Sequence, residues 1–122
     1  MKPNKRLVYS TETIRKPTGS CFYCGCGMFT GDQTHHRSDD DTRDHIIAKS
    51  RTTHAQYMDN GFPALNEVRV CHDCNHYKGH LAPLDWLVIM PSHEGAERLA
   101  KRLVELGFQM TEISEAMGRR KK

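Results

Sequence analysis

Two Cys-x-x-Cys pairs constrain the fold of this chain more than any other feature of its sequence. The first pair is Cys21 with Cys24 and the second is Cys71 with Cys74, and 46 residues, from 25 to 70, separate them. Four thiolates match the tetrahedral ligand set of a structural zinc site, and turn-forming residues stand beside each pair. We therefore predict that one zinc ion joins two segments that are distant in the sequence.

A fifth cysteine, Cys26, leaves this ligand set open at one position. It closely follows Cys24 in the run Cys-Phe-Tyr-Cys-Gly-Cys-Gly and could replace it as a ligand. The two-residue spacing of the partner pair favours Cys24, so Cys26 is expected to be a free thiol. A thiol–disulfide oxidoreductase would need only one Cys-x-x-Cys pair, so that interpretation explains the sequence least well.

The composition agrees with a small domain that a metal braces. The chain has 122 residues, 37% of them hydrophobic and 27% charged, so a single domain with a thin core is expected. A barrel or a doubly wound sheet is excluded. The longest apolar stretch, residues 86–90, is far shorter than the roughly 20 residues of a membrane span. No secretory signal is recognisable, and we expect a cytoplasmic protein without membrane contact.

Apolar patterns divide the chain into three regions. Residues 1–19 are expected to be a basic flexible arm, residues 20–90 a core with both cysteine pairs, and residues 91–122 a helical extension with a basic tail. Residues 48–63 are predicted to form a polar loop. Two strands are predicted, one ending near 44–47 and one over 66–70. Two helices follow, one opening in the second cysteine pair and one over 83–89. The C-terminal extension is predicted to form a helix from Ser92, with Leu99, Leu103, Val104 and Leu106 as its apolar face, and a last helix with Thr111 as N-cap and Gly118 at its end.

Between and within the cysteine pairs lie residues in an order that points to chemistry. Asp44 and His45 are adjacent at the end of a predicted strand, Asn66 starts the next strand, and Asn75 directly follows Cys74. Each of these features is common alone, but their order and spacing together are specific.

In this arrangement the sequence resembles the HNH endonucleases, whose core is the ββα-metal (His-Me) finger. The resemblance covers about residues 20–85, and Asn75 stands where the third signature His often sits, which makes this an HNN variant. Ala48 stands where many members have Pro. The resemblance implies a small α+β fold with a nuclease core over 20–90, stabilised by a four-cysteine zinc site and followed by C-terminal helices. It rests on the segments Asp44-His45-Ile46-Ile47, Asn66-Glu67-Val68-Arg69-Val70 and Cys71-His72-Asp73-Cys74-Asn75-His76-Tyr77-Lys78-Gly79.

The resemblance also implies a role for each of these residues. His45 would be the general base that deprotonates a water molecule, as an imidazole with a near-neutral pKa can do. Asp44 and Asn75 would hold one catalytic divalent ion, and their hard oxygen ligands suit Mg²⁺ or Mn²⁺. Asn66 would fix the loop or the ring orientation of His45. The implied activity is metal-dependent hydrolysis of DNA phosphodiester bonds, by nicking or by double-strand cutting.

The resemblance implies that the ββα unit lies against the DNA minor groove and contacts mostly the phosphate backbone, and such contacts do not specify sequence. The net charge of +3 does not identify a nucleic-acid binder by itself, so the placement of the basic residues matters more. The expected contacts are the arm, Lys49, Arg51, Lys78 and the tail over 119–122, although Lys78 could equally be a solvated helix charge. His72, His76 and His80 are ambiguous: His76 or His80 could face the phosphate or the metal, but exposure to solvent is expected.

Two questions about setting and class stay open at this level. By analogy, a small nuclease of this type suits a phage or another mobile element, in a bacterial or phage-infected cell. Double-strand cutting by one active site would need a dimer or two successive nicks. The alternative from another class is a noncatalytic module, held together by zinc, that binds DNA or protein. The intact set of Asp44, His45, Asn66 and Asn75 favours the enzyme.

Overall fold

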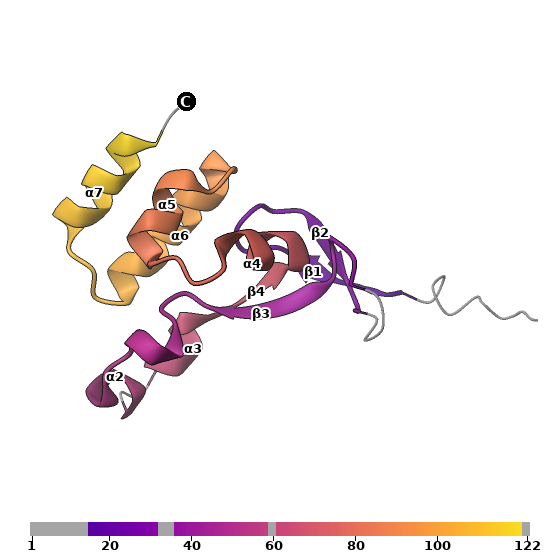
Figure 1. Ribbon diagram of the computed structural model, residues 1–122, viewed down its shortest axis with the longest axis horizontal. Coiled ribbons are helices and arrows are strands. Elements are labelled where there is room, and N and C mark those ends of the chain that lie inside the picture. Colours follow the sequence, from indigo (N-terminus) through magenta and orange to yellow (C-terminus); the bar gives the residue numbers. More distant parts are fainter. Residues whose placement is uncertain (1–14, 32–35, 59–60, 121–122) are drawn as a thin grey trace, which may run out of the picture.

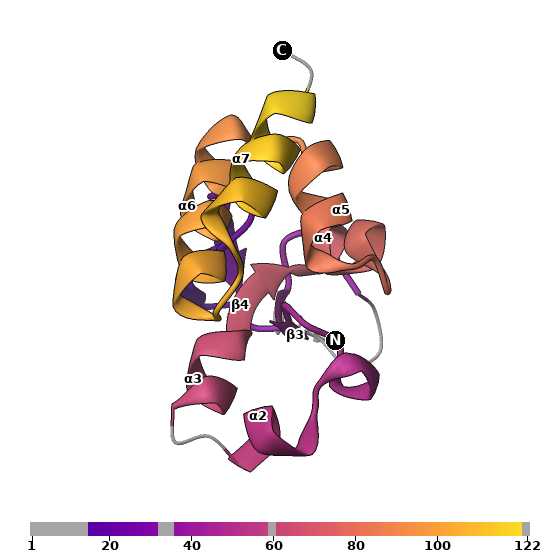
Figure 2. The same cartoon turned by 90° about the vertical axis from the view of Figure 1, so that its left-hand side faces the viewer.

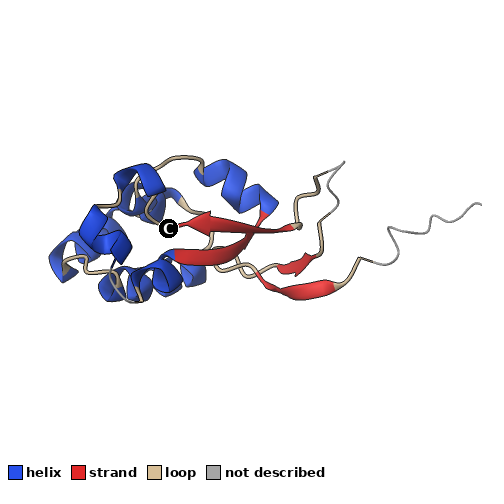
Figure 3. Cartoon of the chain, turned by 90° about the horizontal axis from the view of Figure 1, so that it is seen from below, coloured by secondary structure: helices blue, strands red, loops and turns tan. Residues whose placement is uncertain are grey.

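The computed structural model describes residues 15–31, 36–58 and 61–120, which form a small mixed α/β fold with two small sheets and several helices (Figure 1). The strands lie toward one side of the molecule and most of the helices toward the other (Figure 3). In chain order the elements are β1 (Pro17–Ser20), β2 (Gly27–Phe29), β3 (Asp41–His45), η2 (Lys49–Arg51), α2 (His54–Met58), α3 (Phe62–Asn66), β4 (Glu67–Cys71), α4 (His72–Lys78), α5 (Pro83–Ile89), α6 (His93–Glu105) and α7 (Met110–Arg119).

A strand–strand–helix unit forms the centre of the molecule. β3 and β4 pair antiparallel, with Asp41 opposite Cys71 and His45 opposite Glu67. α4 follows β4 without a connecting loop and contacts both strands. Both strands were predicted from their sequence, and the packing of α4 on β3 brings the end of α4 to the C-terminal end of β3.

The first cysteine pair lies in the turn between β1 and β2, which pair antiparallel. The C-terminal end of the expected flexible arm belongs to this hairpin, because β1 begins at Pro17. Residues 17–19 of the expected arm are therefore in a strand, and Arg15 and Lys16 form hydrogen bonds with Thr30. The rest of the arm, residues 1–14, lies outside the described residues.

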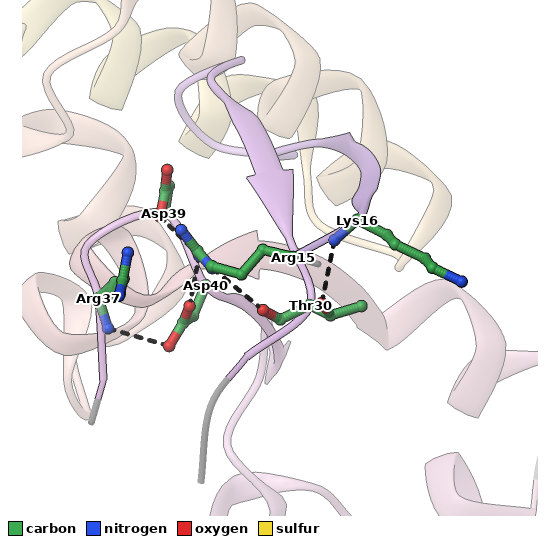
Figure 4. A network of polar contacts seen from close by, with 6 residues as sticks. All are labelled: Arg15, Lys16, Thr30, Arg37, Asp39 and Asp40. Atoms are coloured by element: carbon green, nitrogen blue, oxygen red, sulfur yellow. Dashed lines mark hydrogen bonds and ion pairs between the residues drawn. The ribbon is translucent and has the colours of Figure 1, made fainter. Parts of the chain in front are cut away.

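A network of polar contacts fastens the β1–β2 hairpin to the start of β3 (Figure 4). Asp40, whose side chain is 2% exposed, accepts hydrogen bonds from the Arg15 guanidinium at 2.7 Å and from the backbone N–H of Arg37 at 2.9 Å. Arg15 also binds Asp39 at 2.9 Å, which holds the pKa of that carboxyl below its usual range. The acidic residues just before β3 therefore include a buried contact of the fold.

The three C-terminal helices, α5, α6 and α7, pack on one another at one end of the molecule (Figure 2). α6 begins at the predicted position, where the Ser92 hydroxyl accepts a hydrogen bond from the backbone N–H of Gly95 at 2.9 Å. Three details of the prediction are wrong. Val104 is 44% exposed, α7 is capped by Gln109 instead of Thr111, and Gly118 lies inside α7.

Gly95 sets how closely α6 approaches the first cysteine pair. A Cβ atom at this position would lie 1.6 Å from the backbone carbonyl oxygen of Tyr23, so no other residue type fits without movement of the backbone. Tyr23 itself is fully buried and packs on Trp86 of α5. The first cysteine pair is thus held between the central sheet and the C-terminal helices.

Residues 48–63 were predicted to be a polar loop, but they contain η2, α2 and the first two residues of α3. Asn66 is the last residue of α3, so β4 begins one residue later than predicted. Among the described residues, no helix is long and apolar enough to cross a lipid bilayer.

Candidate functional site

Four cysteines come together between the first hairpin and the β4–α4 junction. The sulfur atoms of Cys21, Cys24, Cys71 and Cys74 all lie within 4.8 Å of one another, and those of Cys24 and Cys71 are 3.8 Å apart. Cys24 is half-buried and the other three are buried. Such a group could bind a structural metal such as zinc, and the structure places Cys24, not Cys26, in it.

Backbone N–H groups point at two of these sulfur atoms. The N–H groups of Tyr23 and Cys24 donate to the sulfur of Cys21 at 3.3 and 3.4 Å. In the second pair, the N–H of Cys74 donates to the sulfur of Cys71 at 3.4 Å, because Cys71 caps α4. N–H donors stabilise a thiolate, so both turns suit metal-bound sulfur.

The protonation states of the cluster also favour a cation at its centre. The Cys74 thiol donates to Cys21, which lowers the pKa of Cys21 to about 4 and raises the pKa of Cys74. Burial raises the pKa of Cys71. A divalent metal would supply the positive charge that four close thiolates need, and it would displace thiol protons on binding.

The second part of the candidate site is a groove of about 540 Å³ at the end of β3. Asp44 and His45 reach it from β3, and Asn75 reaches it from the middle of α4. The structure therefore brings together three of the four residues that the resemblance named as catalytic. The remaining groove residues are Arg43, Ala48, Lys49, His72, His76, Lys78, Gly79 and His80.

Asn66 does not line this groove but holds the segment that follows His45. Its side-chain oxygen accepts from the backbone N–H of Ile47 at 2.8 Å, and its side-chain nitrogen donates to the carbonyl of Ile47 at 2.9 Å. Its own carbonyl accepts from the N–H of Ile46 at 2.8 Å. Asn66 is almost fully buried, and these three hydrogen bonds fix the backbone directly after His45.

Asn75 is oriented by the strand beneath it. Its Nδ2 donates to the hydroxyl of Thr42 at 3.0 Å and to the backbone carbonyl of Arg43 at 3.1 Å. A carbonyl oxygen only accepts hydrogen bonds, so the amide nitrogen must face β3. The Oδ1 atom of Asn75 is then the end of the amide that remains for another ligand.

Asp44 is held by two side chains that the sequence did not connect with it. Its Oδ2 accepts from the hydroxyl of Tyr23 at 2.6 Å and lies 3.1 Å from the ammonium of Lys78. Lys78 is 2% exposed and also donates to the carbonyl of His45 at 3.3 Å. It is therefore not a solvated helix charge, whereas its expected contact with a phosphate stays a prediction, since Lys78 lines the groove.

Tyr23 was missed in the sequence analysis. The only signal for it was its place as an aromatic residue between two cysteines that were expected to bind metal. Burial and the charge of Asp44 raise the pKa of Tyr23, so its hydroxyl stays protonated and acts as a hydrogen-bond donor.

Basic and imidazole side chains surround the groove. Lys49 is exposed and lines it, whereas Arg51 is exposed but lies outside its lining. The imidazole ring of His72 stacks on that of His36, with ring centroids 5.0 Å apart. It also stacks on the ring of His76, with centroids 6.1 Å apart. His76 and His80 are exposed as expected, while His72 is only half-exposed.

Comparisons of this chain with protein-family models, with curated proteins and with solved structures found no match. The chemistry of the site is therefore inferred from its own residues and their geometry.

Proposed function

We propose that the protein is a metal-dependent endonuclease of the HNH type that hydrolyses phosphodiester bonds of DNA. The observation that carries this proposal is the meeting of Asp44, His45 and Asn75 in one open groove. In this interpretation β3, β4 and α4 are the ββα-metal finger, and the four cysteines hold a structural zinc ion beside it.

The groove offers ligands that fit a divalent cation. The contacts of Asp44 with described residues use Oδ2, so Oδ1 remains for a cation, as does Oδ1 of Asn75. Both are hard oxygen ligands, which suit Mg²⁺ or Mn²⁺. When bound there, such an ion would stabilise the negative charge that develops on the phosphate and its leaving oxygen.

His45 is the residue proposed to accept a proton from the attacking water. It ends β3 at the groove, and no described residue forms a hydrogen bond with its ring. Lys78 holds its backbone carbonyl, and Asn66 clamps the next residues, so the imidazole is presented from a fixed backbone. General-base catalysis of this kind contributes about 10²–10⁴-fold to a rate.

DNA is the proposed partner, held through its phosphates along the minor groove. Lys49 lies in the lining of the groove and Arg51 follows in the same short helix, so both can meet phosphates on one side of the scissile bond. Such contacts carry little sequence information and make binding sensitive to salt.

Cleavage of a supercoiled plasmid tests this function. Purified protein is incubated with the plasmid and with Mg²⁺, Mn²⁺ or EDTA, beside the variants His45→Ala and His93→Ala. His93 is an exposed surface histidine paired with Glu97, so it is a matched control. We expect metal-dependent nicking or linearisation by the wild type and by His93→Ala, and a loss of about 10²–10⁴-fold in His45→Ala. An intact plasmid with every metal contradicts the enzyme, and equal cutting by His45→Ala contradicts its role as base.

One observation favours a second candidate function, a noncatalytic zinc-containing module that binds DNA or protein. The Lys78 ammonium already lies beside the Asp44 carboxylate and compensates its charge. If this pair excluded divalent cations, the fold would remain but the groove could not cut. Salt-sensitive DNA binding without cleavage, in protein that holds zinc, would support this candidate over the nuclease.

A further inference from the structure

We infer that Tyr23 is a positioning residue that connects the cysteine cluster to cation binding by Asp44. This inference rests on the proposed function only in assigning a divalent-cation site to the groove. It adds a residue and a coupling that the HNH resemblance did not supply.

The Tyr23 hydroxyl makes a buried, charge-assisted hydrogen bond. Tyr23 is 0% exposed, and the 2.6 Å distance from its oxygen to Asp44 Oδ2 is in the short range of hydroxyl–carboxylate bonds. Its ring packs edge-to-face on Trp86, with centroids 5.3 Å apart. Its backbone carbonyl is covered by Gly95, where even a Cβ atom would not fit. The hydroxyl is therefore fixed in position by packing on its ring and on its backbone.

This fixed hydroxyl determines which oxygen of Asp44 stays available. Tyr23 and Lys78 both bind Oδ2, so Oδ1 is left for a cation. Without the hydroxyl, Lys78 would be the remaining partner of the carboxylate among the described residues. The ammonium could then pair with either oxygen and compete with a divalent ion for the whole carboxylate.

The position of Tyr23 depends in turn on the cysteine cluster. Tyr23 stands between Cys21 and Cys24, and its backbone N–H donates to the sulfur of Cys21 at 3.3 Å. A metal bound to both cysteines would fix this turn and, with it, the Tyr23 hydroxyl. Partners that orient a metal ligand typically change metal affinity by about 10- to 100-fold when they are removed.

The test compares Tyr23→Phe with Tyr77→Phe in the full, zinc-loaded chain. Both tyrosines pack edge-to-face on Trp86, Tyr77 with a centroid distance of 5.7 Å, and each change removes one hydroxyl. Tyr77 is 57% exposed, and its hydroxyl makes no hydrogen bond to a described residue. Mn²⁺ is the probe, its free concentration is followed by electron paramagnetic resonance without DNA, and zinc content is measured in parallel.

We expect Tyr23→Phe to keep its zinc and to bind Mn²⁺ about 10- to 100-fold more weakly, whereas Tyr77→Phe binds it as the wild type does. In an Asp44→Asn background, Tyr23→Phe should cause no further loss, because the ligand that it positions is already changed. Unchanged Mn²⁺ affinity in Tyr23→Phe overturns the inference. Loss of zinc from Tyr23→Phe also overturns it, because the hydroxyl would then serve the fold.

These outcomes separate the inference from the proposed function. A wild type that binds Mn²⁺, loses affinity on Tyr23→Phe and leaves plasmid intact supports the inference and contradicts the nuclease. A wild type that cuts plasmid, with a Tyr23→Phe variant of equal Mn²⁺ affinity, supports the nuclease and overturns the inference. A wild type without any Mn²⁺ binding overturns both.

Discussion

The cysteine cluster and the groove at the end of β3 are built from neighbouring residues but differ in almost every physical property. The cluster has four identical soft ligands within 4.8 Å of one another, three of them buried. The groove has hard oxygen and imidazole groups around about 540 Å³ of open space. Closed sites of the first kind stabilise folds, whereas open sites leave room for a substrate. Cys74 and Asn75 are adjacent in α4, so one short helix contributes to both.

The largest difference between the two regions should appear when one ligand of the cluster is removed. We expect Cys74→Ser to lose its metal and its cooperative thermal unfolding, because structural zinc contributes about 10–16 kcal/mol in zinc-finger peptides. Cys26→Ser is the matched control, since Cys26 lies outside the group of four, and it should keep both properties. Zinc content and circular dichroism during heating measure the effect. A folded Cys74→Ser protein without zinc would show that the cluster does not stabilise the fold.

The close packing behind the cluster can be tested at a glycine. Gly95→Ala would force a methyl group onto the carbonyl of Tyr23, so we expect a destabilisation of about 3 kcal/mol, the upper end of the usual cost of overpacking. Gly118 lies within α7 with open space around it, and Gly118→Ala should be neutral or stabilise by up to about 1 kcal/mol. Chemical denaturation of both variants measures the contrast. Equal stabilities would mean that α6 can move away from the cysteine pair at little cost.

On the groove side, Asn66→Ala should lower both the free energy of unfolding and the nicking activity. The change leaves the buried backbone N–H and carbonyl of Ile47 without their partners, which costs about 1–3 kcal/mol. Plasmid nicking should fall even at temperatures where the variant is fully folded, since the backbone after His45 is released. Activity equal to that of the wild type in the folded variant would limit Asn66 to a structural role.

The smallest effect is expected at the rim of the groove. Lys49→Ala should lower the slope of log binding constant against log salt by about 1, as should Arg51→Ala, because each removes one phosphate contact. Lys101→Ala, an exposed lysine of α6 away from the groove, should leave the slope unchanged. Fluorescence anisotropy with labelled duplex DNA at several salt concentrations gives the slopes. Equal slopes in all three variants would exclude this rim as the DNA surface.

The parts of the fold that the sequence predicted correctly have strong local signals. Alternating residues marked β4, and Ser92 with the apolar spacing of Leu99 and Leu103 marked α6. The paired Cys-x-x-Cys spacing likewise predicted the cluster, since metal ligands must meet whatever lies between them. In contrast, α2 and α3 have five residues each, too few for a helical period to be visible.

The errors have physical reasons as well. Thr111 is a common capping type, but Gln109 with Glu112 forms a reciprocal cap that starts α7 earlier. Lys78 looked like a surface charge because a lysine is rarely buried, and only the packing of α4 on β3 shows that Asp44 lies within its reach. Tyr23 and Asp44 are 21 residues apart, so no local pattern could join them.

The chain has one tryptophan, Trp86, and it is fully buried at the junction of the cysteine pair, α4 and α5. The rings of Tyr23 and Tyr77 both contact it edge-to-face. Its fluorescence is therefore an intrinsic, label-free signal. Its ring contacts Tyr23, which in turn forms hydrogen bonds with Cys21 of the cluster and with Asp44 of the groove. A shift of its emission to longer wavelength on chelation would report that metal release opens the molecule at this junction, and the same signal would resolve the order in which the two regions come apart.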